Sequence, residues 1–352
     1  MTSRVLVTGA TGLIGCHTAA ALAREGFAVR ALVRDTAKLD AVMKPFALDP
    51  GLITPVRGDV TDRDSVEMAV SGCDAAIHCA GRFSHDLSEA ANLHAVNVGG
   101  TECVLRAAVQ ARLDPVIHIS SMLALLPPRG PRMSANDPVG DASAMYSRTK
   151  ADSDRIARQL QDDGAAVSVV YPGSVQGPND PTVGSGPAIF ADYLERGRVL
   201  VTSGGLAYTD VRDLAELLVR LVRPGQGPRR IMAPTDFVEH ARFHSLLCEL
   251  TGRALRADRV PAVALRLLGR LGDLRQRLTG KATRLTSEAA LVLTRGVPFD
   301  DAEGRALLGA PPRDAEESFR ELLRWMYETG VLEARHVGRI ATGSSSEGAQ
   351  HR

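Results

Sequence analysis

Short apolar runs alternate with amphipathic or alanine-rich stretches through the first half of the chain. A short apolar run bounded by turn residues is typical of a buried strand, whereas a longer amphipathic or alanine-rich stretch indicates a helix. We therefore expect strands near residues 5–8, 28–33, 52–57, 74–79, 115–119 and 167–171, with long helices at 90–111 and 141–161. This alternation predicts an α/β fold, a doubly wound parallel sheet that binds ligands at the carboxyl ends of its strands.

The second half of the chain predicts a smaller, mostly helical lobe. Glycine and proline residues crowd the stretch after Tyr171, so we place the end of the first domain at residue 177 and the lobe at 178–335. Residues 199–232 are expected to return to the first domain, and 336–352 to form a disordered Gly/Ser-rich tail. Helices are predicted near 188–196, 237–250, 260–278 and 287–294. The basic, apolar stretch 265–271 is compatible with a membrane surface, although docking on its own domain is the favoured interpretation.

The first strand runs into a glycine-rich turn. Gly9, Gly12 and Gly15 are spaced by three, with Thr11, Leu13 and Ile14 between them, and an alanine-rich helix follows. Glycines allow a tight turn and a close backbone approach, and the N–H groups of the new helix bind anions. The turn therefore predicts a dinucleotide diphosphate site, with an ordinary strand-to-helix turn as the alternative.

The end of the second expected strand bears on the choice of dinucleotide. Arg34 follows this strand, and Lys38 lies one helical turn further on. Cations at this place suit a ribose 2′-phosphate, whereas an acidic residue would bind a free 2′-hydroxyl. We predict NADP, and Asp35 beside the arginine makes NAD the alternative. Asp59, Ala80 and Gly81 stand at the ends of neighbouring strands.

A tyrosine, a lysine and a serine are the residues best placed for acid–base chemistry. Tyr146 and Lys150 are four apart and so share a helical face, and Ser121 ends the preceding strand. A nearby ammonium favours the phenolate, so Tyr146 could exchange a proton with a substrate oxygen while Ser121 hydrogen-bonds that oxygen. Ser120 is the alternative serine.

Composition limits the partners and the compartment. The 352 residues include 42 Lys plus Arg and 41 Asp plus Glu, so no field of one sign recruits nucleic acid. Five scattered cysteines without CxxC spacing argue against a disulfide framework or a metal site. With no signal-peptide pattern and no apolar run of membrane-spanning length, a cytoplasmic protein with small-molecule partners is expected.

Together these motifs resemble the extended short-chain dehydrogenase/reductases, within the NAD-dependent epimerase/dehydratase superfamily. The segments Thr8–Gly15, Tyr146–Lys150, Tyr171–Pro178 and Asp210–Ala215 carry the likeness, and residues 29–35 are similar to the dihydroflavonol reductase branch, with the 3β-hydroxysteroid dehydrogenases as the other near relative. The resemblance implies a Rossmann fold with Ser121, Tyr146 and Lys150 as the catalytic trio. It also implies cofactor contacts from Gly9, Thr11, Gly12, Leu13, Ile14, Gly15, Arg34, Lys38, Asp59, Val60, Cys79, Ala80, Gly81, Asn97, Tyr146, Lys150, Pro172, Gly173, Ser174 and Val175.

The expected activity is hydride transfer between NADP and an apolar ketone or secondary alcohol. The apolar residues 122–126 stand where sugar-nucleotide epimerases of the family usually have a Val-Tyr-Gly turn, which implies a more apolar pocket. A nucleotide-sugar epimerase or dehydratase with tightly bound NAD is one alternative, and a non-catalytic dinucleotide sensor is another. The family likeness also implies a homodimer formed by the helices at 90–111 and 141–161.

Overall fold

A seven-stranded parallel sheet forms the larger part of the computed structural model, which describes residues 3–49, 51–84, 86–141, 144–280, 283 and 285–342. Its strands are β1 (Arg4–Thr8), β2 (Ala28–Val33), β3 (Ile53–Arg57), β4 (Ala75–His78), β5 (Val116–Ile119), β6 (Val167–Tyr171) and β10 (Arg229–Met232). They lie in the order β10-β6-β5-β4-β1-β2-β3. Pro55 lies in β3 at the edge, where its missing N–H leaves no internal ladder bond unmade.

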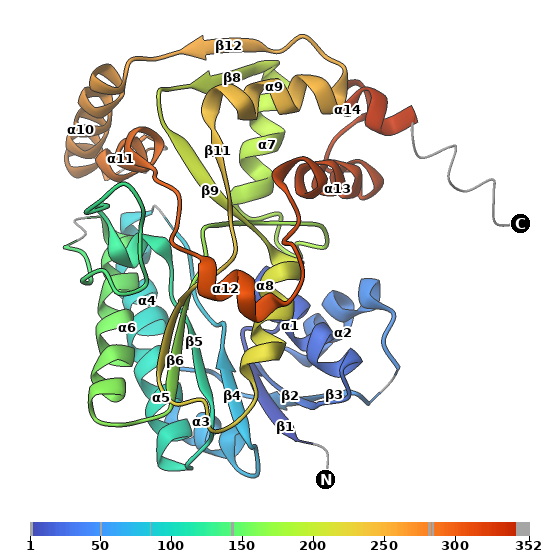
Figure 1. Cartoon of the computed structure of the whole chain (residues 1–352), viewed down its shortest axis with the longest axis vertical. Helices are drawn as coiled ribbons and strands as arrows, with labels where there is room; N and C mark the ends of the chain where they lie inside the picture. Colours follow the sequence, from blue (N-terminus) through green and yellow to red (C-terminus); the bar gives the residue numbers. More distant parts are fainter. Residues whose placement is uncertain are drawn as a thin grey trace, which may run out of the picture.

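Helices cover both faces of this sheet, as Figure 1 shows. One face carries α1 (Leu13–Arg24), α2 (Thr36–Met43) and α8 (Val211–Leu221). The other carries α3 (Arg63–Val70), α5 (Gly100–Gln110) and α6 (Met145–Asp162), with α4 (Ala90–His94) leading into α5 through a π-helical turn at Ala95–Gly99. Because both faces are covered, the strands are apolar along most of their length, and the predicted Rossmann architecture is confirmed.

The remaining elements form a lobe beyond the carboxyl ends of the strands (Figure 1). It contains a three-stranded sheet of β7 (Ser174–Gln176), β9 (Gly205–Asp210) and β11 (Asp236–Glu239), and the pair β8 (Arg198–Val201) and β12 (Arg256–Arg259). Its helices are α7 (Ser185–Arg196), α9 (His240–Thr251), α10 (Ala262–Thr279), α11 (Ser287–Arg295), α13 (Ala315–Glu328) and α14 (Ala334–Val337). An aromatic cluster of Phe190, Tyr208, Phe243 and Phe319 lies at the centre of the lobe. A further helix, α12 (Ala302–Leu308), packs back on α8 and β10.

The structure differs from the sequence expectations at three places. Of the segment 199–232, only α8 and β10 join the first domain, whereas β8 and β9 pair with lobe strands. The stretch predicted as a helix from residue 237 begins as strand β11, because pairing with β9 across the lobe outweighs local helix propensity. The expected tail from residue 336 is ordered as far as 342, since Val337 and Ile340 are buried in the lobe core; residues 343–352 lie outside the described part.

Candidate functional site

The glycine turn after β1 is compressed between two neighbouring segments. Gly9 has a φ of +72°, and a Cβ built on it would lie 2.6 Å from the backbone nitrogen of Ala80. A Cβ on Gly15 would lie 2.2 Å from the Gly9 carbonyl oxygen. No side chain larger than hydrogen fits at either position, so these glycines fix the close contact of β1, α1 and the turn after β4.

The helix that follows begins with its N-terminus open. Gly12 caps α1 without a side-chain hydrogen bond, no acidic residue lies in the first turn, and a Cβ on Gly12 would meet only the Gly9 oxygen, at 3.5 Å. The first N–H groups of a helix have no acceptor within the helix, and they carry its positive dipole end. The N–H groups of Leu13, Ile14 and Gly15 therefore fit a dinucleotide diphosphate.

Arg34 and Asp59 face each other across the ends of β2 and β3. Arg34 Nη1 lies 3.9 Å from Asp59 Oδ2, and the arginine side chain is 74% exposed. Asp35 is occupied elsewhere, because its Oδ1 accepts the Lys38 backbone N–H at 3.1 Å as the N-cap of α2. Arg34 is therefore exposed and held only by a long ion pair with Asp59, whereas the Asp35 carboxylate is committed to the helix. Val60 is buried against Gly100 on the inner side of this edge.

Asn97 links the turn after β4 to α6. Its Oδ1 accepts the Arg82 N–H at 2.7 Å, and its Nδ2 donates to the Arg82 carbonyl and to Thr149 Oγ1, both at 2.9 Å. It lies in the π-helical turn, a feature frequently found at functional sites. Its amide is satisfied by protein groups, so its role in the structure is to position the turn at Cys79–Arg82 against the helix that carries Tyr146.

Lys150 reaches from α6 to the end of β5. Its Nζ donates to the Ile119 carbonyl at 3.1 Å and lies 3.9 Å from where a Cβ on Gly81 would be. Burial lowers the pKa of Lys150 to about 8, against the opposing effect of the negative charge of Asp154. The lysine therefore still carries its charge near neutral pH, at the junction of β4, β5 and α6.

Tyr146 lies one turn before Lys150 on the same helix, with its ring edge-on to Phe83 at 4.7 Å between centroids. Burial, together with the negative charge of Glu288 on α11, raises the pKa of Tyr146 above its ordinary range. Lys150, which was expected to favour the phenolate, is not among the causes of this shift. The protein itself holds the phenol protonated, which is the form that donates a proton.

The two serines after β5 have different surroundings. Ser120 is buried, and its hydroxyl donates to Asp154 Oδ1 at 2.8 Å. Ser121 is partly exposed, and its Oγ accepts the Leu123 N–H at 3.2 Å at the start of the 3-10 turn Met122–Leu125. That bond orients Ser121 Oγ and leaves its hydroxyl proton free to donate, so Ser121 is the better placed of the two.

Behind Lys150 lies a buried acid that the sequence analysis did not single out. Asp154 accepts hydrogen bonds from Ser120, from Arg158 Nε at 2.8 Å and from the Tyr171 hydroxyl at 3.2 Å. It follows Lys150 by four residues, so both lie on the α6 face that packs on β5 and β6. The sequence signal that could have identified Asp154 is the regular spacing of four residues from Tyr146 through Lys150 and Asp154 to Arg158. This network fixes α6 against the sheet.

A narrow apolar pocket with a free volume of about 10 Å³ lies between the first domain and the lobe. It is lined by Met122, Leu126, Pro128, Met133, Leu206, Ala207, Val292, Gly296, Val297 and Phe299. Met122 directly follows Ser121, and Val292 lies one turn after Glu288 on α11. Met122 and Leu126 of the apolar segment 122–126 line this pocket together with Pro128 of the loop that follows, whereas Ala124 and Leu125 belong to the core.

The segment expected to flank the nicotinamide is anchored to the lobe. Gly173 N–H donates to Thr209 Oγ1 at 3.0 Å, and a Cβ on Gly173 would lie 2.3 Å from the Ala207 carbonyl oxygen. Ser174 and Val175 follow in β7, which pairs with β9. Pro172–Val175 therefore lies where the two parts of the molecule join.

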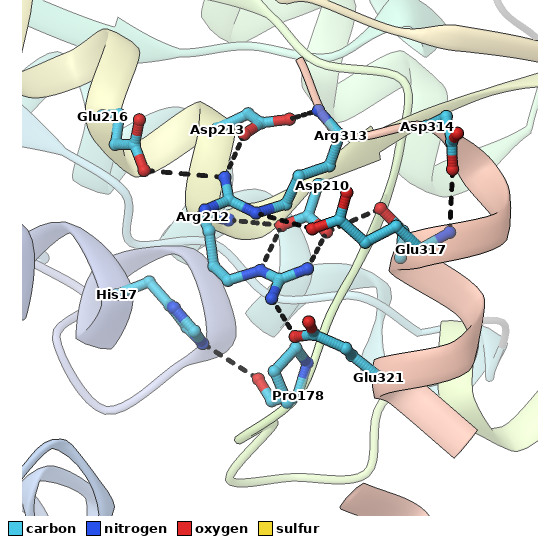
Figure 2. A network of polar contacts seen from close by, with 11 residues as sticks. His17, Pro178, Asp210, Arg212, Asp213, Glu216, Arg313, Asp314, Glu317 and Glu321 are labelled. Atoms are coloured by element: carbon cyan, nitrogen blue, oxygen red, sulfur yellow. Dashed lines mark hydrogen bonds and ion pairs between the residues drawn. The ribbon is translucent and has the colours of Figure 1, made fainter. Parts of the chain in front are cut away.

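A polar network next to this segment ties the lobe to the first domain (Figure 2). Arg212, at the start of α8, bonds Asp210 through Nε at 2.9 Å and Nη2 at 2.7 Å, and it also contacts Glu321 of α13. Ser318 donates to Asp210 at 2.6 Å. On the other side, His17 of α1 hydrogen-bonds the Pro178 carbonyl at 2.9 Å. Helix α1 thus contacts the segment after β7 through His17, and the Arg212 contacts join the start of α8 to α13 of the lobe.

The described residues hold neither a metal-binding cluster nor a membrane-spanning helix. No three His, Cys, Asp or Glu side chains come together there as a metal site would require. None of the helices in that part of the chain has the length and apolar character needed to cross a membrane.

Comparison with known families decides the assignment of the chain. The model of the NAD dependent epimerase/dehydratase family matches residues 5–232. The chain belongs to this family. It is therefore an NAD(P)-dependent oxidoreductase of the extended short-chain type, acting on CH–OH or C=O groups.

Three relatives narrow the comparison within the NAD dependent epimerase/dehydratase family. The chain is 29% identical to the 4-hydroxy-2-methyl-3-oxo-4-farnesyl-3,4-dihydroquinoline-1-oxide ketoreductase of Stigmatella aurantiaca, covering 91% of this chain and 96% of that protein. It is 26% identical to sterol demethylase protein B of Methylococcus capsulatus, and the match covers 93% of this chain and 99% of that protein. It is also 30% identical to a putative dihydroflavonol 4-reductase of Synechocystis sp., and this match covers 59% of this chain and 60% of that protein.

Solved structures support the fold. The Bordetella bronchiseptica enzyme WbmH in complex with NAD+ superposes with a TM-score of 0.72 at 18% identity, over 94% of this chain and 100% of that one. At this identity the likeness concerns the fold.

Proposed function

We propose that the protein is an NADP-dependent reductase of an apolar ketone. The observation that carries the proposal is that the oriented Ser121 is followed directly by Met122, which forms part of the wall of a narrow recess lined only by apolar residues. The names of two relatives that match over nearly their whole length, a farnesyl-quinoline ketoreductase and a sterol demethylase protein, point to substrates of the same apolar character.

Side chains of the protein donate the proton that the ketone oxygen receives, and they also position the substrate. Ser121 donates a hydrogen bond to the ketone oxygen and thereby stabilises the negative charge that develops there. Tyr146 donates its phenolic proton to the same oxygen, and Lys150 holds a positive charge on the next turn of α6. A bound nicotinamide supplies the hydride, so that one hydride and one proton convert C=O to CH–OH.

Reduction needs a proton donor at the ketone oxygen, and the phenol of Tyr146 is protonated near neutral pH, as an ordinary tyrosine is. We propose ketone reduction because a relative that matches over nearly its whole length is named a ketoreductase.

The enzyme is tested with a panel of apolar ketones and NADPH. We expect consumption of NADPH with at least one polycyclic or prenylated ketone, and freshly purified protein without a nicotinamide absorbance. A nucleotide-sugar epimerase would retain NAD through purification and convert a sugar nucleotide without net NADPH consumption. Binding of NADPH with no turnover of any ketone would favour a non-catalytic sensor instead.

Cofactor choice is tested at Arg34. An Arg34→Ser variant is expected to raise the KM for NADPH roughly 10- to 100-fold and to leave that for NADH within about twofold, because a charge-assisted bond to the 2′-phosphate is worth about 1.5–3 kcal/mol. Steady-state kinetics with both cofactors measures the ratio. Arg57→Ser, another exposed cation at the sheet edge, is the control. Equal losses with NADPH and NADH would contradict a 2′-phosphate contact.

A further inference from the structure

Helix α10 of the lobe presents large apolar side chains to the outside. Val263, Leu267, Leu268, Leu271, Leu274 and Leu278 are all exposed, from 49% at Leu268 to 77% at Leu278. Exposed large apolar residues are common singly, but a contiguous set on one element marks an interaction site. Within the described chain, α10 alone gathers six of them.

These side chains form one stripe along the helix. Val263, Leu267, Leu271, Leu274 and Leu278 follow one another at steps of three or four residues, so they lie on a single face over the whole length of α10.

The inner face of α10 is made of smaller groups. Gly269 and Gly272 lie against the segment that leads into α11, where a Cβ on Gly269 would come within 2.7 Å of the Thr286 carbonyl oxygen. A helix docked only on its own domain would place its leucines inward. In α10 the close glycine contact faces the protein, and most of the leucines face away from it.

The charges on α10 favour an anionic partner. The helix carries four arginines, at 266, 270, 275 and 277, and a single acid, Asp273, which accepts the Ser287 N–H of α11. Arg270, Arg275 and Arg277 are exposed, and none of them forms an ion pair with another described residue. Since 42 basic and 41 acidic residues balance in the whole chain, this excess is local.

We propose that α10 lies in the interfacial plane of an anionic lipid bilayer, with its leucine stripe among the acyl chains and its arginines at the lipid phosphates. An apolar stripe flanked by cations is the arrangement of helices that bind such surfaces without crossing them. A symmetric contact with a second copy would instead bring the arginines of two α10 helices together, which like charges oppose.

The position of α10 makes this surface relevant to the catalytic site. It packs on α11, which contributes Val292 to the apolar pocket, and Figure 1 shows the α10–α11 pair on the margin of the lobe. A bilayer at α10 would thus lie next to the element that borders the pocket. The proposal does not depend on the identity of the ketone, because its test reads binding and not turnover.

The test is sedimentation of the full-length protein with vesicles. We expect wild-type protein to bind mixed phosphatidylcholine and phosphatidylglycerol vesicles at least about tenfold more tightly than pure phosphatidylcholine vesicles, with binding weakened by salt. Leu267→Ser/Leu271→Ser/Leu274→Ser should reduce binding at least tenfold, and Arg270→Glu/Arg275→Glu/Arg277→Glu should remove the preference for the anionic lipid. Met68→Ser/Ile189→Ser removes two exposed apolar residues elsewhere and should bind as wild type.

A spectroscopic variant keeps the test independent of the serine substitutions. The chain has one tryptophan, Trp325, so Leu271→Trp adds a reporter at the centre of the stripe, and its emission should shift to the blue with the mixed vesicles. The proposal is overturned if wild-type protein stays in the supernatant, if the leucine variant binds as wild type, or if the added tryptophan shows no shift. It is also overturned if light scattering without lipid shows a dimer that the leucine substitutions dissociate.

Discussion

Replacing Tyr146 by phenylalanine is expected to lower kcat for ketone reduction about a thousandfold while leaving NADPH affinity within about threefold. General acid catalysis contributes roughly 10²- to 10⁴-fold, and the hydroxyl is the only part of Tyr146 that can supply the proton. The ring, edge-on to Phe83, is retained, so α6 and Lys150 keep their places. Turnover is measured by NADPH absorbance, and affinity by quenching of the single tryptophan.

Tyr193→Phe is the matched control for this experiment. Tyr193 is a partly buried tyrosine that packs on Phe243 in the lobe, away from α6. Its substitution by phenylalanine removes the same hydroxyl group. It should retain kcat within about twofold. If Tyr146→Phe kept more than about a tenth of wild-type kcat, Tyr146 would not be the proton donor and the proposed mechanism would be wrong.

Replacing Arg212 by methionine is expected to cost about 3–5 kcal/mol of unfolding free energy near neutral pH. The Asp210 side chain is fully buried, and Arg212 is its only cationic partner in the described chain, so the change strands a buried carboxylate. Methionine keeps most of the length of the arginine side chain, which limits the loss of packing. Urea unfolding followed by Trp325 fluorescence measures the effect.

The pH dependence gives this prediction a second readout. Burial alone would raise the pKa of Asp210, but the hydrogen bonds and charge of Arg212 hold it below its ordinary value. Its contribution to wild-type stability is therefore present above the ordinary aspartate pKa and is lost as pH falls below it. Without the Arg212 side chain, the hydrogen bonds from Ser318 and from the backbone N–H of residue 212 remain, but the positive charge that offsets burial is lost. The folded-state pKa of Asp210 therefore rises, and protonation relieves the cost. The difference in unfolding free energy between wild type and Arg212→Met should therefore be smaller at about pH 5 than at about pH 7.

Arg242→Met serves as the control for Arg212→Met. Arg242 pairs with Glu249 at 2.8 Å, but both side chains are at least half exposed, and exposed pairs contribute at most about 1 kcal/mol. A loss of similar size in both variants, or a difference for Arg212→Met that stays constant with pH, would contradict the role assigned to the Asp210–Arg212 pair.

The parallel sheet was predictable because its evidence is local. Each strand of the first domain is a short, mostly apolar run ended by turn residues. Strand β11 was missed because its strand character comes from pairing with β9, some thirty residues earlier in the chain. Local patterns hold no information on such a partner.

In the candidate site, too, some features could be predicted from the sequence and others depend on the fold. The residue types of Ser121, Tyr146 and Lys150 can be read from the sequence, and their catalytic roles stay predictions. The hydrogen bonds of Asn97 to Arg82 and Thr149 cannot be read from it, because they depend on which groups the fold brings together. The bond of Asp35 to the Lys38 N–H is instead a local N-cap. The raised pKa of Tyr146 depends on burial and on Glu288, which lies far away in the sequence.

Because of the route of the chain between β6 and β10, the first domain cannot be separated from the lobe by a single cut in the sequence. Strand β10 completes the parallel sheet only after the chain has passed through β7, α7, β8 and β9. A fragment ending at residue 177 would leave the β6 edge unpaired, and it would also lack the leucines of α8 that cover one face of the sheet. Such a fragment should aggregate when expressed alone. Exchange of lobes between relatives therefore requires replacing internal segments and keeping α8 and β10 in place.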